Sequence, residues 1–284
     1  MPNMGRQNGS CTLLVDAIAK EILIKAFPPI TFIDLHVTDD CNLRCPYCFV
    51  HGKRNNQMTD DVAFAAVDFL IRESRDQDIL RILFIGGEPL LEFDLMQRIV
   101  LYAGKASIKH RKRINYDTTT NGTLFNEEIL EFFRDSKISF LLSMDGGKES
   151  HDMHRKFAGG IGSFDTVVSK IPLMKKYQPW LGIRVTPTPQ TISRLFEDVK
   201  ELYQLGANQF IIGPATGVTW SFEDFALYQS QMLLIADWYV KLKRRRAHLR
   251  INQFGDDASD LLGNKQGIWG CGAGKSRISI STSG

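Results

Sequence analysis

Three of the five cysteines in this 284-residue chain stand close together, in the spacing C-x3-C-x2-C. They are Cys41, Cys45 and Cys48, and all three lie in the segment 39–52. Three thiolates on one loop can bind a single metal centre. A [4Fe–4S] cluster normally takes four cysteine ligands, so a loop that supplies three leaves one iron with an open coordination position. An open position lets a metal centre carry out chemistry instead of only stabilising a fold.

A disulfide framework and a structural zinc site are the alternatives for this cysteine loop. A disulfide framework is disfavoured, because cysteine is sparse in a chain of this length. A structural zinc site remains open, because His51 follows Cys48 by three residues and would complete a Cys3His ligand set. Structural zinc sites usually use two ligand pairs separated by a longer spacer, which this segment lacks. The loop by itself therefore favours iron–sulfur over zinc.

The composition is that of an ordinary globular protein, with 43% hydrophobic and 24% charged residues. The net charge of +3 gives no reason to expect nucleic-acid binding. The apolar-rich stretch 11–27 is interrupted by charged residues, so it predicts an amphipathic helix and neither a membrane span nor a signal peptide. We therefore expect no membrane association, and a reducing cytoplasm that keeps the thiols available.

Apolar strand-like and amphipathic helix-like segments alternate about six times along the chain. Such alternation predicts an α/β fold, with a parallel sheet and helices outside it. The short apolar strands are typical of strands buried on both faces. After a helix at 12–26, the predicted strands are 30–37, 81–85, 113–119, 138–143, 182–186 and 209–212, and the predicted helices are 59–74, 92–107, 126–135, 163–177, 193–205 and 222–246.

The residues that could carry chemistry follow the ends of the predicted strands. The cysteine loop follows the first strand, and Gly86-Gly87-Glu88-Pro89 follows the second. Thr120-Asn121-Gly122 follows the third, and Ser143-Met144-Asp145-Gly146 follows the fourth. Because the carboxyl ends of parallel barrel strands meet at one rim, we expect these four segments to form one site.

The cysteine spacing, with Tyr47 before the last cysteine, together with Gly86-Gly87-Glu88-Pro89, resembles the radical S-adenosylmethionine (SAM) superfamily. The resemblance implies a partial (βα)6 TIM-like barrel over residues 30–255. It also implies that the three cysteines hold a [4Fe–4S] cluster that binds SAM at its open iron, with Tyr47 shielding the cluster. Gly86 and Gly87 allow close backbone approach, and Glu88 would pair with the methionyl ammonium group of SAM.

The segment from Ser143 to Arg155, which includes His151, resembles a finer group, the peptide maturases with a SPASM or twitch extension. The resemblance implies that Ser143 and Arg155 contact the SAM carboxylate, which a guanidinium can hold bidentately. Asn121 resembles the group's strand-end motif near the ribose, with a simple turn residue as the alternative. Asp256 and Asp257 are candidates for a catalytic base or substrate anchor, and a helix N-cap is the alternative for them.

The resemblance also implies a reaction. An electron donor such as flavodoxin or ferredoxin reduces the cluster, which then donates one electron to SAM. The resulting 5′-deoxyadenosyl radical abstracts a hydrogen atom from the substrate. We predict a peptide maturase that installs a thioether or carbon–carbon crosslink on a ribosomally made precursor peptide (a RiPP). The alternatives are a radical SAM enzyme acting on a small molecule, a cofactor precursor or a sulfatase, and, from a different class, a non-enzymatic zinc-binding module.

The region 256–284 resembles the beginning of a SPASM-type extension, after an N-terminal part at 1–29 and the barrel at 30–255. Cys271 would be its first cluster ligand, with a buried structural thiol as the alternative. Residues 277–281 alternate like a strand and 282–284 like a turn, so we expect the first, unpaired strand of a hairpin. We expect this region to be truncated, and an auxiliary iron–sulfur cluster only in a longer natural chain.

Overall fold

The structure, a computed structural model, describes residues 28–50, 55–255 and 275–284. Several predictions therefore fall outside the described residues. They concern the helix at 12–26 and the residues His51, Asp256, Asp257 and Cys271.

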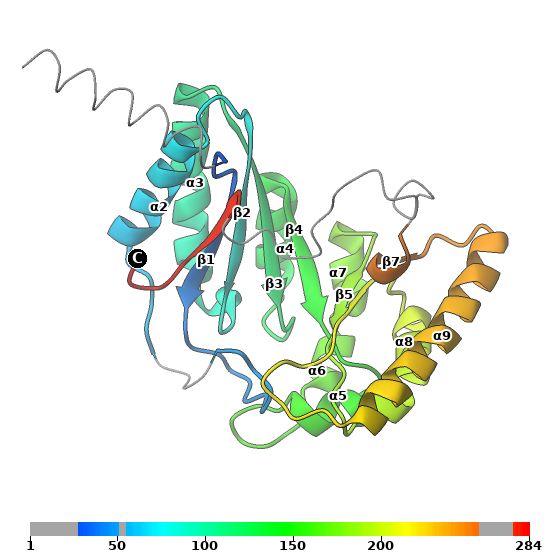
Figure 1. Cartoon of the computed structure of the whole chain (residues 1–284). Coiled ribbons are helices and arrows are strands. Elements are labelled where there is room, and N and C mark those ends of the chain that lie inside the picture. The colour runs from blue at the N-terminus through cyan, green and yellow to red at the C-terminus, as the bar shows by residue number, and fades with distance from the viewer. Residues whose placement is uncertain (1–27, 51–54, 256–274) are drawn as a thin grey trace, which may run out of the picture.

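Eight parallel strands form one open sheet in the order β7-β6-β5-β4-β3-β2-β1-β8 (Figure 1). Strands β1 to β7 lie side by side in chain order, and each of β1 to β6 is followed by a helix. The predicted α/β architecture of the radical SAM type is therefore confirmed. The strands are β1 (Phe32–Thr38), β2 (Ile79–Gly86), β3 (Arg113–Thr120), β4 (Ile138–Ser143), β5 (Gly182–Val185), β6 (Gln209–Ile212), β7 (Arg250–Ile251) and β8 (Arg277–Ile280).

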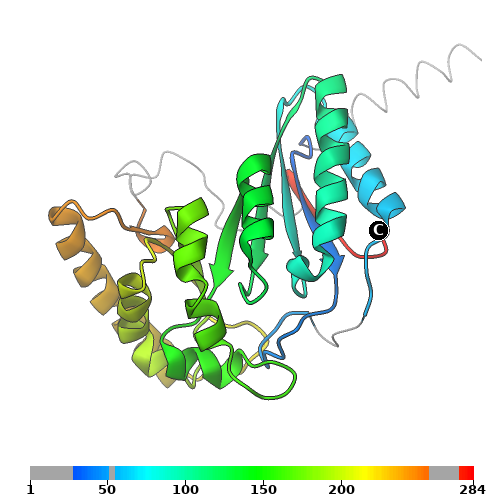
Figure 2. The ribbon, with the colours of Figure 1, turned by 180° about the vertical axis from the view of Figure 1, so that it is seen from behind.

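The helices cover one face of the sheet, which is turned toward the viewer in Figure 2. Polar side chains begin several of them, since the hydroxyl of Thr59 and the amide of Asn126 accept hydrogen bonds from first-turn N–H groups, and Ser221 forms a capping box. No helix in the described ranges has an apolar stretch long enough to cross a membrane. The α-helices are α2 (Asp60–Glu73), α3 (Phe93–Lys109), α4 (Glu127–Ser136), α5 (Lys148–His154), α6 (Phe164–Val168), α7 (Ile171–Tyr177), α8 (Leu195–Gln204) and α9 (Phe222–Arg244), and 3-10 turns occupy Pro89–Glu92, Ile192–Arg194 and Asn252–Phe254.

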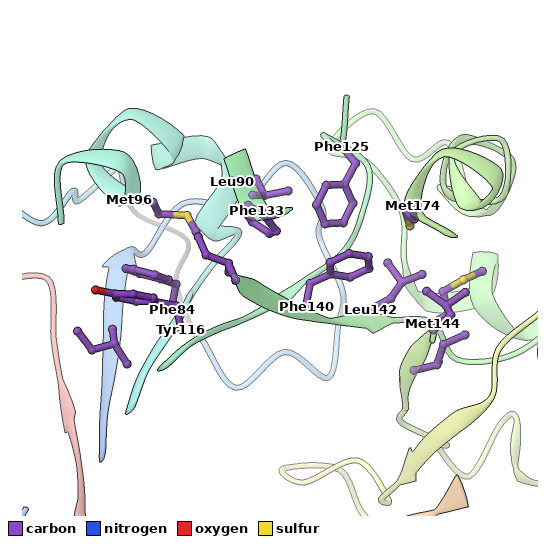
Figure 3. Close-up of a cluster of buried hydrophobic side chains, with 14 of the residues drawn as sticks. Phe84, Leu90, Met96, Tyr116, Phe125, Phe133, Phe140, Leu142, Met144 and Met174 are labelled. Atoms are coloured by element: carbon purple, nitrogen blue, oxygen red, sulfur yellow. The ribbon is translucent and has the colours of Figure 1, made fainter. Parts of the chain in front are cut away.

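The hydrophobic core lies between the helices and the sheet face that they cover (Figure 3). Aromatic rings fill much of it, as where Phe125 packs against Phe140 with ring centroids 4.8 Å apart. The prediction that the strands are buried on both faces is wrong. In β4, Phe140 and Leu142 are buried against the helices, whereas Leu141 and Ser143 point to the other face and line a cavity. Side chains alternate because successive strand residues point to opposite faces of the sheet.

Two local predictions between β4 and β5 are also corrected. Residues 148–154, for which no helix was predicted, form α5. The single helix predicted over 163–177 is divided into α6 and α7, because Pro172 lacks an N–H and its ring would clash with the carbonyl of Val168, four residues earlier. The short strand β7 was not predicted.

The segment 277–280 is not the unpaired strand of a hairpin. It forms β8, which lies beside β1 as a parallel strand, with Arg277 opposite Phe32 and Ser279 opposite Asp34 (Figure 1, red beside blue). The Arg277 guanidinium binds the Asp34 carboxylate with N–O distances of 2.7 and 2.9 Å. A parallel partner for the β1 edge satisfies backbone groups that a terminal hairpin would leave unpaired. The turn predicted over 282–284 is confirmed by a hydrogen bond from the Gly284 N–H to the Ser281 carbonyl.

Candidate active site

A cavity of about 390 Å³ opens on the face of the sheet opposite the helices, which we call the inner face. This volume is within the range of small-molecule sites. Larger surface depressions near Trp180 and Tyr102 contain none of the predicted site residues. Every predicted site residue within the described ranges lines the cavity, namely Cys41, Cys45, Tyr47, Cys48, Gly86, Gly87, Glu88, Asn121, Ser143 and Arg155.

The cysteine loop presents its three thiols to this cavity. Cys41 is buried, Cys45 and Cys48 are half-buried, and none of them forms a disulfide with another described residue. The Cys41 sulfur accepts hydrogen bonds from the Leu43 N–H at 3.3 Å and from the Asn121 side-chain amide at 3.8 Å. N–H donors favour a thiolate over a thiol, and such hydrogen bonds are usual at iron–sulfur ligands. The donor set therefore fits a cluster.

Gly86 and Gly87 let the end of β2 pack against the start of the cysteine loop. A Cβ atom on Gly86 would lie 2.1 Å from the Thr38 carbonyl oxygen, and one on Gly87 would lie 1.8 Å from the Asp40 carbonyl oxygen. The Gly87 N–H donates to the Thr38 carbonyl at 2.8 Å, and the Glu88 N–H donates to the Asp40 carbonyl at 2.8 Å. In this structure, therefore, the two glycines allow the backbone of the cysteine loop to lie against the end of β2.

Glu88 places a buried carboxylate behind the cysteine loop. It accepts hydrogen bonds from the Thr120 hydroxyl at 2.7 Å, the Asn121 N–H at 2.7 Å and the Leu90 N–H at 3.1 Å. Burial raises the pKa of Glu88, and these hydrogen bonds oppose the rise. No lysine, arginine or histidine of the described residues forms an ion pair with it, so a ligand ammonium would find an oriented carboxylate there.

Asn121 connects the end of β3 to the cysteine loop. Its side-chain NH2 donates to the Asn42 side-chain oxygen at 2.8 Å, and Asn42 in turn donates to the Thr123 hydroxyl at 2.7 Å. The Asn121 side-chain oxygen accepts from the Thr123 N–H at 2.9 Å, which is an Asx turn. Asn121 is therefore a turn residue, which was its alternative role from the sequence, and it also lines the cavity.

A buried ion pair links the segment after β4 to the end of α5. The Arg155 Nε donates to Asp145 at 2.9 Å and its Nη2 donates at 3.1 Å, and the Thr186 N–H and the Tyr47 hydroxyl also donate to Asp145. The Arg155 guanidinium lies 5.7 Å from the centre of the Tyr47 ring. Burial disfavours the charge of Arg155, but Asp145, Tyr47 and Cys45 together more than offset this, so the pKa of Arg155 is raised. The pairing of Asp145 with Arg155 was not predicted from the sequence.

His151 supports the segment that carries Arg155. The Ser163 hydroxyl donates to the Arg155 carbonyl at 2.8 Å, so Ser163 accepts from the His151 Nε2–H at 2.9 Å. Burial lowers the pKa of His151 to about 4, so the imidazole is neutral at physiological pH. The histidine therefore acts on the site through the backbone position of Arg155.

A family model described as "Radical SAM superfamily" matches residues 35–202, which include the cysteine loop, the Glu88 segment and the Asp145–Arg155 pair. The chain belongs to the radical SAM superfamily. The match starts in β1 and ends in α8, so it contains the first five of the six βα units.

Several relatives are anaerobic sulfatase-maturating enzymes, and another is an S-adenosylmethionine-dependent nucleotide dehydratase. The cysteine-type anaerobic sulfatase-maturating enzyme of Clostridium perfringens is 31% identical over 185 residues, covering 61% of this chain and 49% of that enzyme. This chain thus spans about half the length of the curated relatives that it matches.

Solved structures share the fold. The enzyme anSMEcpe with bound AdoMet superposes with a TM-score of 0.76 at 23% identity, covering 90% of this chain and 73% of that one. The same enzyme with AdoMet and the peptide Cp18Cys is 25% identical, with a TM-score of 0.70, covering 80% of this chain and 64% of that one. Streptococcus suis SuiB bound to its precursor peptide SuiA has a TM-score of 0.64 at 17% identity, covering all of this chain and 66% of that one.

Proposed function

We propose that this radical SAM enzyme modifies a peptide by hydrogen abstraction, installing a thioether or carbon–carbon crosslink on a ribosomally made precursor. The observation that carries the proposal is the arrangement of the cavity, in which three thiols, a buried carboxylate and a buried arginine lie around one space. When bound, the cluster and SAM supply a hydrogen-abstracting 5′-deoxyadenosyl radical. The electron would come from a small donor protein such as flavodoxin or ferredoxin.

The residues present suit each part of the cofactors. Cys41, Cys45 and Cys48 would hold the [4Fe–4S] cluster. The Glu88 carboxylate would bind the methionyl ammonium, because three donors already fix its orientation. Ser143 and Arg155 would receive the methionyl carboxylate. The hydrogen bonds of Arg155 to Asp145 use Nε and Nη2, and Asp145 keeps the guanidinium charged and in place.

A peptide substrate is supported by the relatives, since anSMEcpe and SuiB have both been solved with peptides bound. Sulfatase maturation is a second candidate, favoured by the 31% identity to the C. perfringens enzyme. The auxiliary cluster of a SPASM-type extension remains a proposal for a longer natural chain.

The cofactor part of the proposal is tested by anaerobic reconstitution of the chain with iron and sulfide. We expect about four iron atoms per chain and formation of 5′-deoxyadenosine when dithionite and SAM are added. Cys45→Ala should lose both, whereas Cys41→Ser tests whether a weaker oxygen ligand retains any cluster. SAM cleavage at the wild-type rate by Cys45→Ala, or stoichiometric zinc in a colourless protein, would refute the proposal.

The substrate part is tested separately, by mass spectrometry of candidate peptides after incubation with the active protein. A loss of about two hydrogens, located between two residues by fragmentation, indicates a crosslink. Modification of a sulfatase-derived peptide, with precursor peptides unchanged, would instead select sulfatase maturation. Radical formation without change in either type of peptide would contradict a peptide substrate.

A further inference from the structure

The inner face of the sheet carries several charged side chains, and most of its arginines have a carboxylate partner. Arg277 binds Asp34 at 2.7 Å, and Arg81 lies 3.2 Å from Asp117. Arg155, at the end of α5, is paired with Asp145. Pairing of this kind offsets the cost of removing a charge from water, so each of these arginines has a carboxylate that balances its charge.

Arg184 is different. It lies on β5, its side chain lines the same cavity as the cysteines, and it is opposite Ser143 in the register of β4 and β5. Its guanidinium forms no hydrogen bond and no ion pair with any residue that the structure describes. The surrounding protein disfavours its charge, and burial lowers the pKa of Arg184.

The Arg184 guanidinium lies close to the backbone that follows β6. A Cβ atom on Gly213, just after β6, would lie 2.9 Å from the Arg184 Nη2 atom. The carboxylate of Asp145 attracts Arg184 electrostatically, but four donor groups from Arg155, Thr186 and Tyr47 already bind it. The fold thus places a half-buried cation beside the cavity and uses the nearby carboxylate elsewhere.

We propose that Arg184 binds a carboxylate of a ligand in this cavity. The inference rests on the proposed function, because the ligand is either SAM or the peptide. A guanidinium presents two parallel N–H groups to a carboxylate, and desolvation strengthens the interaction. The methionyl carboxylate of SAM is one source, since Ser143 is the strand neighbour of Arg184. An acidic group of the peptide substrate is the other source, since the cavity also has to admit the residue that loses hydrogen.

The cofactor arm measures binding to the reconstituted protein of two probes that differ only in a carboxylate, S-adenosylhomocysteine and its decarboxylated analogue. If SAM is the source, Arg184→Gln should bind S-adenosylhomocysteine about 10- to 100-fold more weakly and the decarboxylated analogue equally well. Arg184→Lys should recover part of the loss, because it restores charge without the planar fork. Arg81→Gln is the matched control, since Arg81 is an inner-face arginine with its own partner.

The peptide arm uses two synthetic peptides that differ only in an aspartate or an asparagine beside a cysteine. If the substrate is the source, the wild-type protein should prefer the aspartate peptide, and Arg184→Gln should remove the preference while binding S-adenosylhomocysteine normally. If Arg184→Gln changes neither probe pair, the inference is wrong. Wild-type protein that binds neither adenosyl probe would contradict the proposed cofactor, while the peptide arm would still decide the role of Arg184.

Discussion

The two halves of the sheet are built differently on their inner face. In the first half, β1 to β4, the segments that follow the strands are hydrogen-bonded to one another, as where Glu88 binds the Thr120 hydroxyl and Asn121 binds Asn42. In the second half, β5 and β6 have four residues each and β7 has two. There the cavity lining from β5 consists of Arg184 and the adjoining Thr186.

This difference separates two tasks. Groups that must hold one fixed arrangement of cluster and SAM are preorganised when their own hydrogen bonds set their positions before a ligand binds. A lining group that binds no described residue, such as Arg184, can contact a substrate without disturbing that arrangement. The fixed half would therefore serve the cofactors that a whole superfamily shares, and the sparse half would serve the substrate of this enzyme. The predictions below test this division.

The largest effect is expected at the buried pair of Arg155 and Asp145. Arg155→Met leaves the Asp145 carboxylate buried without its cation, which should lower the free energy of unfolding by about 3–5 kcal/mol. Arg81→Met removes a half-exposed arginine from a similar ion pair and should cost about 0–1 kcal/mol. Thermal unfolding midpoints of the reconstituted proteins compare the two.

A second variant at the same residue reports on the cofactor. If Arg155 binds the methionyl carboxylate, Arg155→Ala should weaken SAM binding by about 1.5–3 kcal/mol. Unchanged SAM affinity in a folded Arg155→Ala protein would show that Arg155 only positions Asp145 and Tyr47.

A smaller effect is expected at Asp198, which anchors α5 to α8 in the second half. Its carboxylate is buried and accepts from the Gly147 N–H at 3.0 Å and the Ser150 hydroxyl at 2.7 Å. Burial raises the pKa of Asp198 from 3.8 to about 6, so the folded protein holds a proton there that the unfolded chain releases. The stability of the wild type should therefore fall as pH rises from about 4 to 6, by on the order of 3 kcal/mol.

Asp198→Asn provides the reference for this titration, because its amide has nearly the same shape and does not titrate. The difference in unfolding free energy between wild type and variant, measured by denaturant titration at several pH values, should shift against the wild type as pH rises through this window. A difference that is independent of pH would mean that Asp198 has an ordinary pKa in the folded protein.

The smallest effects compare two glycines, one in each half. Gly87→Ala places a methyl group against the backbone of Asp40, which cannot move without shifting the cysteine loop, so a loss of about 1–3 kcal/mol is expected. Gly213→Ala meets only the far end of the Arg184 side chain, which can rotate about its own bonds, and should cost less than about 0.5 kcal/mol. Thermal unfolding midpoints of the two variants measure these losses. A larger loss at Gly213 than at Gly87 would contradict the assignment of β1 to β4 as the fixed half.

The first half was predicted well from sequence because its strands are rich in β-branched, aromatic or other apolar residues and are followed by turn residues. Strand β3 and helix α4 were placed to within one or two residues, since Asn126 is a strong N-cap. The gathering of Cys41, Glu88 and Ser143 at one cavity was also predicted, because parallel strands bring their carboxyl ends to one edge.

The remaining features depend on contacts that no local pattern records. The helix α5 is short and polar, and its burial comes from His151, His154 and the anchor at Asp198. The pairing of β8 with β1 joins residues 243 positions apart. Arg184 in a strand pattern resembles a solvent-exposed edge residue, and only the cavity and the absence of a partner within the described residues distinguish it. The break before α7 could have been predicted, since Pro172 was visible in the sequence.

The pairing of β8 with β1 also has a consequence for synthesis on the ribosome. Strand β1 leaves the ribosome early, but Arg277, which binds Asp34 across that edge, is translated 243 residues later. At typical elongation rates this interval is roughly 10–50 s. During that time one edge of β1 offers unpaired N–H and C=O groups, to which chaperones or neighbouring nascent chains can bind. The pairing of β8 with β1 is therefore timed by translation, and it occurs beside the strand that leads into the cysteine loop.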